Sequence, residues 1–141
     1  MRVLPGFVFG EHPFIDVLIV PGGVVSAELR KPAVIDWIRS SAETAQLTAS
    51  VCTGSFLLAQ AGLLDGKNAT THWEDVEEMR ERFPTVKVHD DRRWVDEGGV
   101  VTAAGISAGM DMSLHLVARL AGRDLALKTA RQMDYCWREE P

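Results

Sequence analysis

The stretch LTASVCTGSFLLAQAG, residues 47–62, joins a short apolar run to a helical pattern through a cysteine. We expect residues 45–51 to form a buried strand, and Gly54 to Ala61 to form a helix that Gly62 closes. In an open α/β sheet, reactive side chains lie just beyond the carboxyl ends of the strands. Cys52 directly follows such a strand, so the stretch predicts a strand–turn–helix corner with the cysteine at the turn.

Strand and helix patterns alternate on both sides of this corner. The run DVLIVPGG, residues 16–23, is a continuous apolar segment halted by Pro and Gly, which is typical of a strand buried in a parallel sheet. Pro32 occupies a first helical position in the next amphipathic segment. Further helices are expected at residues 31–42, 72–83, 107–122 and 125–137, and a hairpin at 92–105 that turns between Asp96 and Gly99. This alternation predicts an α/β domain with a mostly parallel sheet.

Composition and charge narrow the possible functions. The chain has 141 residues, of which 46% are hydrophobic and 25% charged, and this is enough for one globular domain with a real core. The net charge is −5, and the basic residues are scattered, so we expect no nucleic acid partner. The apolar runs are too short to cross a bilayer and the N-terminus lacks the core of a signal peptide. We therefore expect a cytoplasmic protein without a membrane partner.

The two cysteines need separate explanations. Cys52 and Cys136 show no metal-ligand spacing and accompany no secretory signal, so neither a metal, a cofactor nor a disulfide is expected. Cys52 is either a small buried hydrophobe or a nucleophile on a sharp turn, and the small residues of SVCTGS fit the turn. A helix that starts at Thr53 would direct free N–H groups at the sulfur and favour the reactive thiolate.

A second candidate feature is the pair Gly22-Gly23 at the end of the preceding apolar run. The pair can simply be a turn that needs a positive φ. Beside a nucleophilic cysteine it has another possible role, because the N–H groups of Gly23 and Thr53 could converge on one developing oxyanion. We predict that both groups flank the Cys52 sulfur.

Two histidines have competing interpretations. His72, in the segment ATTHW, either serves as a proton shuttle, which an imidazole can do, or only orients Trp73 at the start of a helix. His115 follows Asp111 by one helical turn, and this spacing predicts a structural pair between the two side chains.

At this point several ordered motifs resemble a known family. DVLIVPGG, SVCTGSFLLAQAGLLDGKNATTHW and DRRWVDEGGVVTAAGISAGMDMSLHLVARLAG together are similar to the ThiJ/PfpI family of the class I glutamine amidotransferase-like superfamily. Within it they most resemble isonitrile hydratases and the amidotransferase-like sensor domains of AraC-type regulators. The resemblance implies a flavodoxin-like three-layer sandwich, a homodimer, and Cys52 as the reactive cysteine, with Thr53 matching the threonine of the hydratase branch. Cys136 departs from the family pattern and has no role that we can assign.

The resemblance also implies a departure at the N-terminus. Family members carry a strand, a helix and a second strand before the segment matched by MRVLP. We therefore expect residues 1–141 to form a single, N-terminally truncated domain that lacks the usual first strand and helix. The acidic residue that bonds the cysteine in relatives lies in that helix, and no residue here inherits its role by position. We further expect residues 16–20 to form an exposed sheet edge, and catalysis by this chain to be impaired.

Three functions remain open from the sequence. The first is a cysteine-dependent enzyme that acts on a small-molecule substrate at an electrophilic carbon, most like the hydration of an isonitrile to an N-substituted formamide. A glyoxalase- or deglycase-like activity is an alternative within this class, in which His72 would pair with the cysteine. The second is the ligand-sensing domain of a transcription regulator, and the third is a scaffold without catalysis. On the enzymatic interpretation, the candidate catalytic residues are Cys52, Thr53, Gly23 and His72.

Overall fold

A four-stranded sheet forms the centre of the computed structural model, which describes residues 2–141; Met1, the first residue of the MRVLP segment, lies outside them. The strand order is β1-β2-β6-β5. The first three strands are parallel and β5 pairs antiparallel with β6 as the predicted hairpin. The strands are β1 Val17–Val20, β2 Leu47–Val51, β5 Trp94–Asp96 and β6 Val100–Ala103. The prediction of an α/β fold with a mostly parallel sheet is therefore confirmed.

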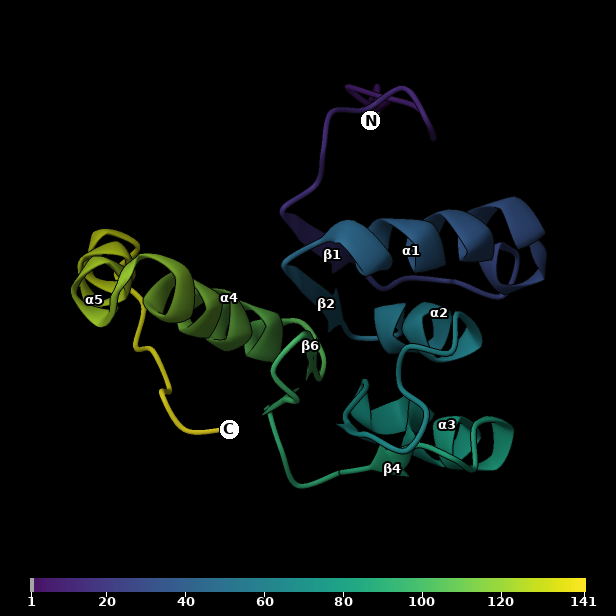
Figure 1. Ribbon diagram of the computed structural model, residues 1–141. Coiled ribbons are helices and arrows are strands. Elements are labelled where there is room, and N and C mark those ends of the chain that lie inside the picture. The colour runs from purple at the N-terminus through teal and green to yellow at the C-terminus, as the bar shows by residue number, and fades with distance from the viewer. Residues whose placement is uncertain (1) are drawn as a thin grey trace.

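Helices cover both faces of this sheet, giving three layers (Figure 1). One face packs against α1 and α2 through Leu18 and Val20, and the other packs against α4 through Leu47 and Ala49. Alternate residues of a strand point to opposite faces, so neighbouring apolar residues serve two cores. The fifth helix, α5, packs on α4. The helices are α1 Pro32–Thr44, α2 Gly54–Gln60, α4 Ser107–Ala121 and α5 Arg123–Gln132.

The segment between α2 and the hairpin differs from the prediction of one helix over residues 72–83. It forms a 3-10 turn, η2 Trp73–Asp75, followed by α3 Val76–Arg82. The His72 side chain accepts the Glu74 N–H, which ends the extended backbone at residue 72 and starts the tighter turn. The sequence analysis also missed three short elements, η1 Glu28–Arg30, β3 Asn68–Ala69 and β4 Lys87–Val88. The last two pair in a separate parallel sheet.

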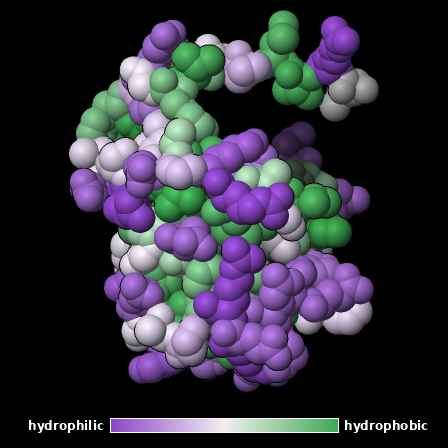
Figure 2. Space-filling view, turned by 90° about the vertical axis from the view of Figure 1, so that its right-hand side faces the viewer, coloured by the Kyte–Doolittle hydropathy of each residue, from purple (hydrophilic) through white to green (hydrophobic). Residues whose placement is uncertain are grey.

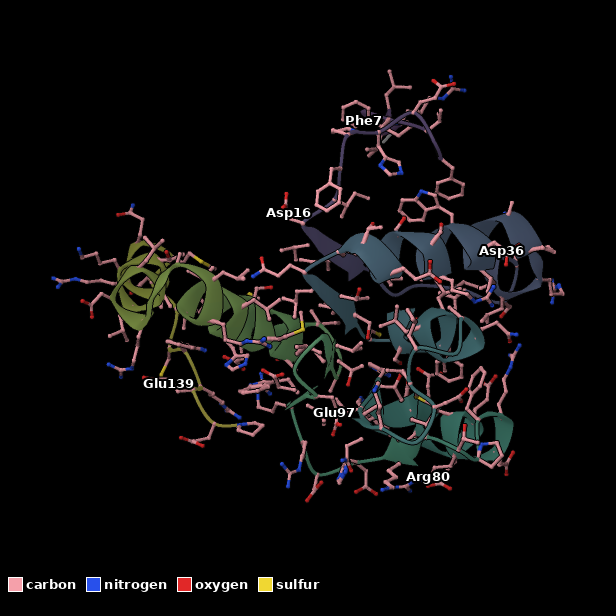
Figure 3. All side chains as sticks on the ribbon, in the orientation of Figure 1. Phe7, Asp16, Asp36, Arg80, Glu97 and Glu139 are labelled. Carbon is pink, nitrogen blue, oxygen red and sulfur yellow. The ribbon has the colours of Figure 1, made fainter. Side chains whose placement is uncertain are left out.

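A buried carboxylate, Asp111, holds the C-terminal segment onto α4. Its Oδ2 accepts from Arg93 Nε at 2.7 Å, and its Oδ1 accepts from the Tyr135 hydroxyl at 2.9 Å and the Arg138 N–H at 3.0 Å. Burial raises the pKa of Tyr135, and its hydrogen bond to Asp111 raises it further. These contacts hold the residues that follow α5 against Asp111 of α4. The helix predicted over residues 125–137 therefore ends at Gln132. Figure 3 shows Glu139 on this segment beside the helices.

The predicted pair between Asp111 and His115 is wrong. His115 Nε2 instead lies 2.7 Å from Asp96 Oδ2 on the hairpin, and Arg119 Nη1 donates to the same oxygen at 2.8 Å. Asp111 is unavailable to His115 because it faces Arg93. Burial pushes the pKa of Asp96 upward, but hydrogen bonds from His115 and the Gly98 N–H, together with the Arg119 charge, hold it below its ordinary value.

The edge strand β1 pairs only with β2 among the described strands. Ile19, which pairs with Ala49 of β2, is 49% exposed. The N-terminal segment runs above α1, where Phe9 stacks on Trp37 with ring centroids 4.6 Å apart, and Phe7 projects at the top of the molecule (Figure 3). Figure 2 shows hydrophobic residues in this projecting segment and hydrophilic residues over most of the lower part of the same view. No helix of residues 2–141 is long and apolar enough to span a bilayer.

Candidate functional site

Cys52 occupies the corner between β2 and α2 in a left-handed backbone conformation, with φ of +56°. A side chain in this region costs about 1–2 kcal/mol, so the surrounding structure must impose it. The Cys52 N–H donates to the carbonyls of Ala103 at 2.9 Å and Ala104 at 3.2 Å. Its own carbonyl accepts from the hydroxyls of Ser55 at 3.0 Å and Thr71 at 3.3 Å. The backbone on both sides of the cysteine is therefore held.

Two glycines allow β1 and its following loop to approach this corner. A Cβ at Gly54 would overlap the Val20 carbonyl oxygen and lie 3.0 Å from the Pro21 oxygen. A Cβ at Gly22 would lie 2.8 Å from both the Cys52 Cβ and the Thr53 nitrogen. The small residues of the motif are thus required where two backbone segments meet, as at sharp strand-to-helix turns elsewhere. The sequence analysis did not assign this role to Gly22.

Thr53 connects the corner to the predicted oxyanion glycine. Its hydroxyl accepts the Gly23 N–H at 2.9 Å and donates to the Gly23 carbonyl at 2.8 Å. The Gly23 N–H therefore has a partner already and is not a free oxyanion donor in this conformation. Within residues 2–141, the Thr53 N–H donates to no protein acceptor. Of the two predicted oxyanion donors, Thr53 is therefore the one whose N–H has no protein partner in the described residues.

The His72 ring lies between a glycine and two carboxylates. A Cβ at Gly105 would overlap the ring at Cδ2 and lie 3.1 Å from Nε2. On the other side, Nδ1 lies 3.5 Å from Asp75 Oδ2 and 3.8 Å from Glu74 Oε2, and accepts the Glu74 N–H at 3.4 Å. The side chain is only 18% exposed, so its position is well defined.

All four sequence-predicted site residues, Cys52, Thr53, Gly23 and His72, line one cavity of about 380 Å³. The structure therefore brings together residues from β1's following loop, the corner after β2, and the segment before α3. Four charged residues that the sequence analysis missed also line it: Glu74, Asp75, Glu78 and Arg82. The signal that could have found them was the run of acidic residues at the start of the predicted helix over residues 72–83. Within residues 2–141, no three His, Cys, Asp or Glu side chains are placed to hold a metal ion.

The chain is similar in sequence to known proteins. The model of the DJ-1/PfpI family matches residues 7–119. The isonitrile hydratase of Pseudomonas putida is 39% identical over 136 residues, which are 96% of this chain and 58% of that protein. The HTH-type transcriptional regulator CdhR of Pseudomonas aeruginosa is 35% identical over 117 residues, or 83% of this chain and 34% of the regulator.

The fold comparison agrees with the sequence comparison. A crystal structure of a ThiJ/PfpI family protein from Pseudomonas syringae superposes with a TM-score of 0.86 and 30% identity, over 96% of this chain and 56% of that one. The chain thus spans little more than half the length of this structure and of the isonitrile hydratase.

Proposed function

The chain belongs to the DJ-1/PfpI family, and from this premise we propose that it carries the cysteine site of an enzyme that hydrates small isonitriles to N-substituted formamides. The observation that carries the proposal is the strained Cys52 corner, which lines one cavity together with Thr53 and His72. A strained, held backbone presents a nucleophile at the end of a strand, where reactive groups lie in α/β folds.

The proposed reaction begins with the Cys52 thiolate. It adds to the terminal carbon of the isonitrile, forming a C–S bond, and that carbon takes a proton to give a thioimidate. Water then adds across the C=N bond, with its oxygen on the carbon and a proton on the nitrogen. The new hydroxyl gives up its proton to the base, and the C–S bond breaks as the C=O bond of the formamide forms. The thiolate leaves with the electron pair of the C–S bond, so that one isonitrile and one water yield one formamide.

Two neighbouring groups support this sequence of steps. In the proposal, the Thr53 N–H, which has no protein acceptor in the described residues, stabilises the oxygen of the tetrahedral intermediate while it is negative, before the C–S bond breaks. The His72 imidazole can both accept and donate a proton, and in the proposal it moves the protons between substrate, water and sulfur. Gly23 has a supporting role in the proposal, because the Thr53 hydroxyl holds both its N–H and its carbonyl.

The proposal is tested by turnover of a simple alkyl isonitrile, followed as formamide by NMR. Cys52→Ala should abolish turnover, while Cys136→Ala, which removes the exposed second thiol, should leave it unchanged. Limited alkylation near neutral pH, mapped by mass spectrometry, should label Cys52 before Cys136. Turnover that survives Cys52→Ala would overturn the proposal, as would preferential labelling of Cys136. Assaying a 2-oxoaldehyde in parallel identifies the glyoxalase-like alternative.

A second candidate function is a ligand-sensing domain, which the similarity to transcription regulators favours. On this hypothesis the same cavity binds a small molecule without converting it. Saturable ligand binding measured by calorimetry, unchanged in Cys52→Ala and without product, would support the sensor and contradict the enzyme.

We also propose a homodimer, in line with the family resemblance. The support is the apolar surface along β1, where Ile19 is 49% and Val24 92% exposed. Size-exclusion chromatography with light scattering should give twice the chain mass, and Ile19→Lys should shift it toward the monomer if β1 contributes to the contact.

A further inference from the structure

The two walls of the Cys52 cavity differ in chemistry. One wall comes from the loop after β1 and from α2, and it is apolar, with Val24, Val25, Leu29 and Phe56. The other comes from the segment that runs from His72 through α3, and it carries every charged side chain of the lining. A ligand that fills the cavity therefore meets hydrocarbon on one side and charge on the other.

The charged wall has a negative balance. Of its three carboxylates, Glu78 lies 3.8 Å from the Arg82 guanidinium, so these two charges largely offset each other. Within residues 2–141, Glu74 and Asp75 have no Lys or Arg within 4.0 Å, and their charged neighbour is His72. Glu74 and Asp75 thus leave two negative charges in the lining of the Cys52 cavity when His72 is neutral, and one when it is protonated.

The partial burial of Asp75 strengthens the effect of its charge on the cavity. Asp75 is 31% exposed, so its field reaches the cavity through less water than that of Glu74, which is 64% exposed. Two formal negative charges on one wall raise the local concentration of cations and lower that of anions. The same charges also oppose entry of an anionic substrate to the thiolate.

On the premise of the proposed function, we infer that this cavity selects small organic cations: an electrophilic carbon on a short apolar stem that bears an ammonium group, with Glu74 and Asp75 facing the cation. The apolar wall accommodates the stem, and the cysteine reaches the carbon. Carboxylate-bearing substrates of the same size are disfavoured.

The inference is tested with two thiol-reactive compounds that carry opposite charges and the same reactive group. In a Cys136→Ser background, 2-(trimethylammonium)ethyl and 2-sulfonatoethyl methanethiosulfonate are compared at Cys52 by mass spectrometry at low ionic strength. The thiolate attacks the sulfenyl sulfur, a disulfide forms, and methanesulfinate leaves with the electron pair. Neutral methyl methanethiosulfonate reports the reactivity of the thiol itself. The cationic reagent should react faster than the anionic one, relative to the same ratio for a free thiol.

Amide variants remove the charge and keep the shape. A unit charge about 7 Å away changes a rate by roughly threefold to sevenfold at dielectric constants of about 40–80, in opposite directions for the two reagents. Glu74→Gln/Asp75→Asn should therefore lower the cation-to-anion ratio at least about tenfold, and added salt should reduce it in the parent. The matched control is Glu77→Gln, which removes a charge from α3 where Glu77 pairs with Arg80 at 2.6 Å, outside the cavity lining. Figure 3 shows Arg80 at the outer side of α3 near β4.

The outcomes separate the inference from the proposed function. A ratio that the double variant leaves unchanged, or one that favours the anionic reagent, overturns the inference. As a second measurement, KM should be lower for an isonitrile that carries a trimethylammonium group than for its carboxylate counterpart, and Glu74→Gln/Asp75→Asn should remove the difference. Absence of isonitrile turnover together with an intact reagent ratio contradicts the proposed reaction and supports the cation preference of the cavity.

Discussion

Gly105→Ala should displace His72 and thereby impair the site without touching the cysteine. The new methyl would lie 3.1 Å from His72 Nε2 and closer still to Cδ2, inside the ordinary contact distance of about 3.5 Å, so the ring must retreat by about 1 Å. The Glu74 backbone and Asp75 lie on its other side and resist this movement. Overpacking of this kind costs about 1–3 kcal/mol of unfolding free energy. A misplacement of about 1 Å can lower catalysis by roughly 10²-fold.

Three measurements report the displacement of the His72 ring and its consequences. Urea unfolding gives the stability loss, kcat/KM for an alkyl isonitrile gives the catalytic loss, and the NMR signal of the His72 Cδ2 proton reports the ring itself. The rate of Cys52 alkylation by iodoacetamide should stay within about twofold, because general acid–base help is not needed for that reaction. Gly99→Ala is the matched control, since a Cβ at Gly99 meets open space.

A double variant isolates the cause. If the methyl acts by pushing on the imidazole, Gly105→Ala should cost less than about 0.5 kcal/mol in a His72→Ala background, where the ring is gone. An equal stability loss in both backgrounds would refute this reasoning, because the methyl would then be clashing with something other than His72.

Three further predictions concern the frame that holds the site. Gly54→Ala should lower the unfolding free energy in urea by about 3 kcal/mol or more, since the methyl meets the backbone oxygen of Val20; a change within 0.5 kcal/mol would contradict the close approach. Asp111→Ala should cost about 2–3 kcal/mol in the same assay and expose the C-terminal segment to limited proteolysis, because the partly exposed Arg93 and the Tyr135 hydroxyl lose the fully buried carboxylate that they share. Asp96 has a lowered pKa in the folded chain, so its contribution is present above the unfolded value near 3.8 and is lost as pH falls through the folded value. Asp96→Asn should therefore reduce the stability difference between pH 7 and pH 3, and an unchanged difference would count against the hydrogen bonds assigned to it.

Local sequence patterns were sufficient for the elements that frame the site. Strand β2, the corner and α2 were predicted close to their observed bounds. The hairpin turn between Asp96 and Gly99 was also predicted correctly. In each case the deciding residues are neighbours in the chain, because hydrophobic periodicity, proline at the first helical turn and glycine at turns act over only a few residues. The location of Cys52 at the end of a strand follows from the same local signals.

Short or interrupted elements could not be found in this way. Strands β3 and β4 have two residues each, too few to show a period. The 3-10 turn before α3 depends on the His72 side chain as an acceptor, and helical periodicity does not reveal such a contact.

The partners within the site were decided by tertiary structure alone. The Thr53 hydroxyl hydrogen-bonds Gly23, and His115 pairs with Asp96 rather than with Asp111, one helical turn before it. Glu74 and Asp75 line the same cavity as the cysteine. The local motifs around Cys52 and Gly22-Gly23, together with the family resemblance, identified Cys52, Gly23, Thr53 and His72 as candidates. Which groups those candidates face depends on how α1, α2 and α4 pack on the sheet. Packing brings together residues that lie 19 to 30 positions apart in the chain, far beyond the reach of local backbone preferences.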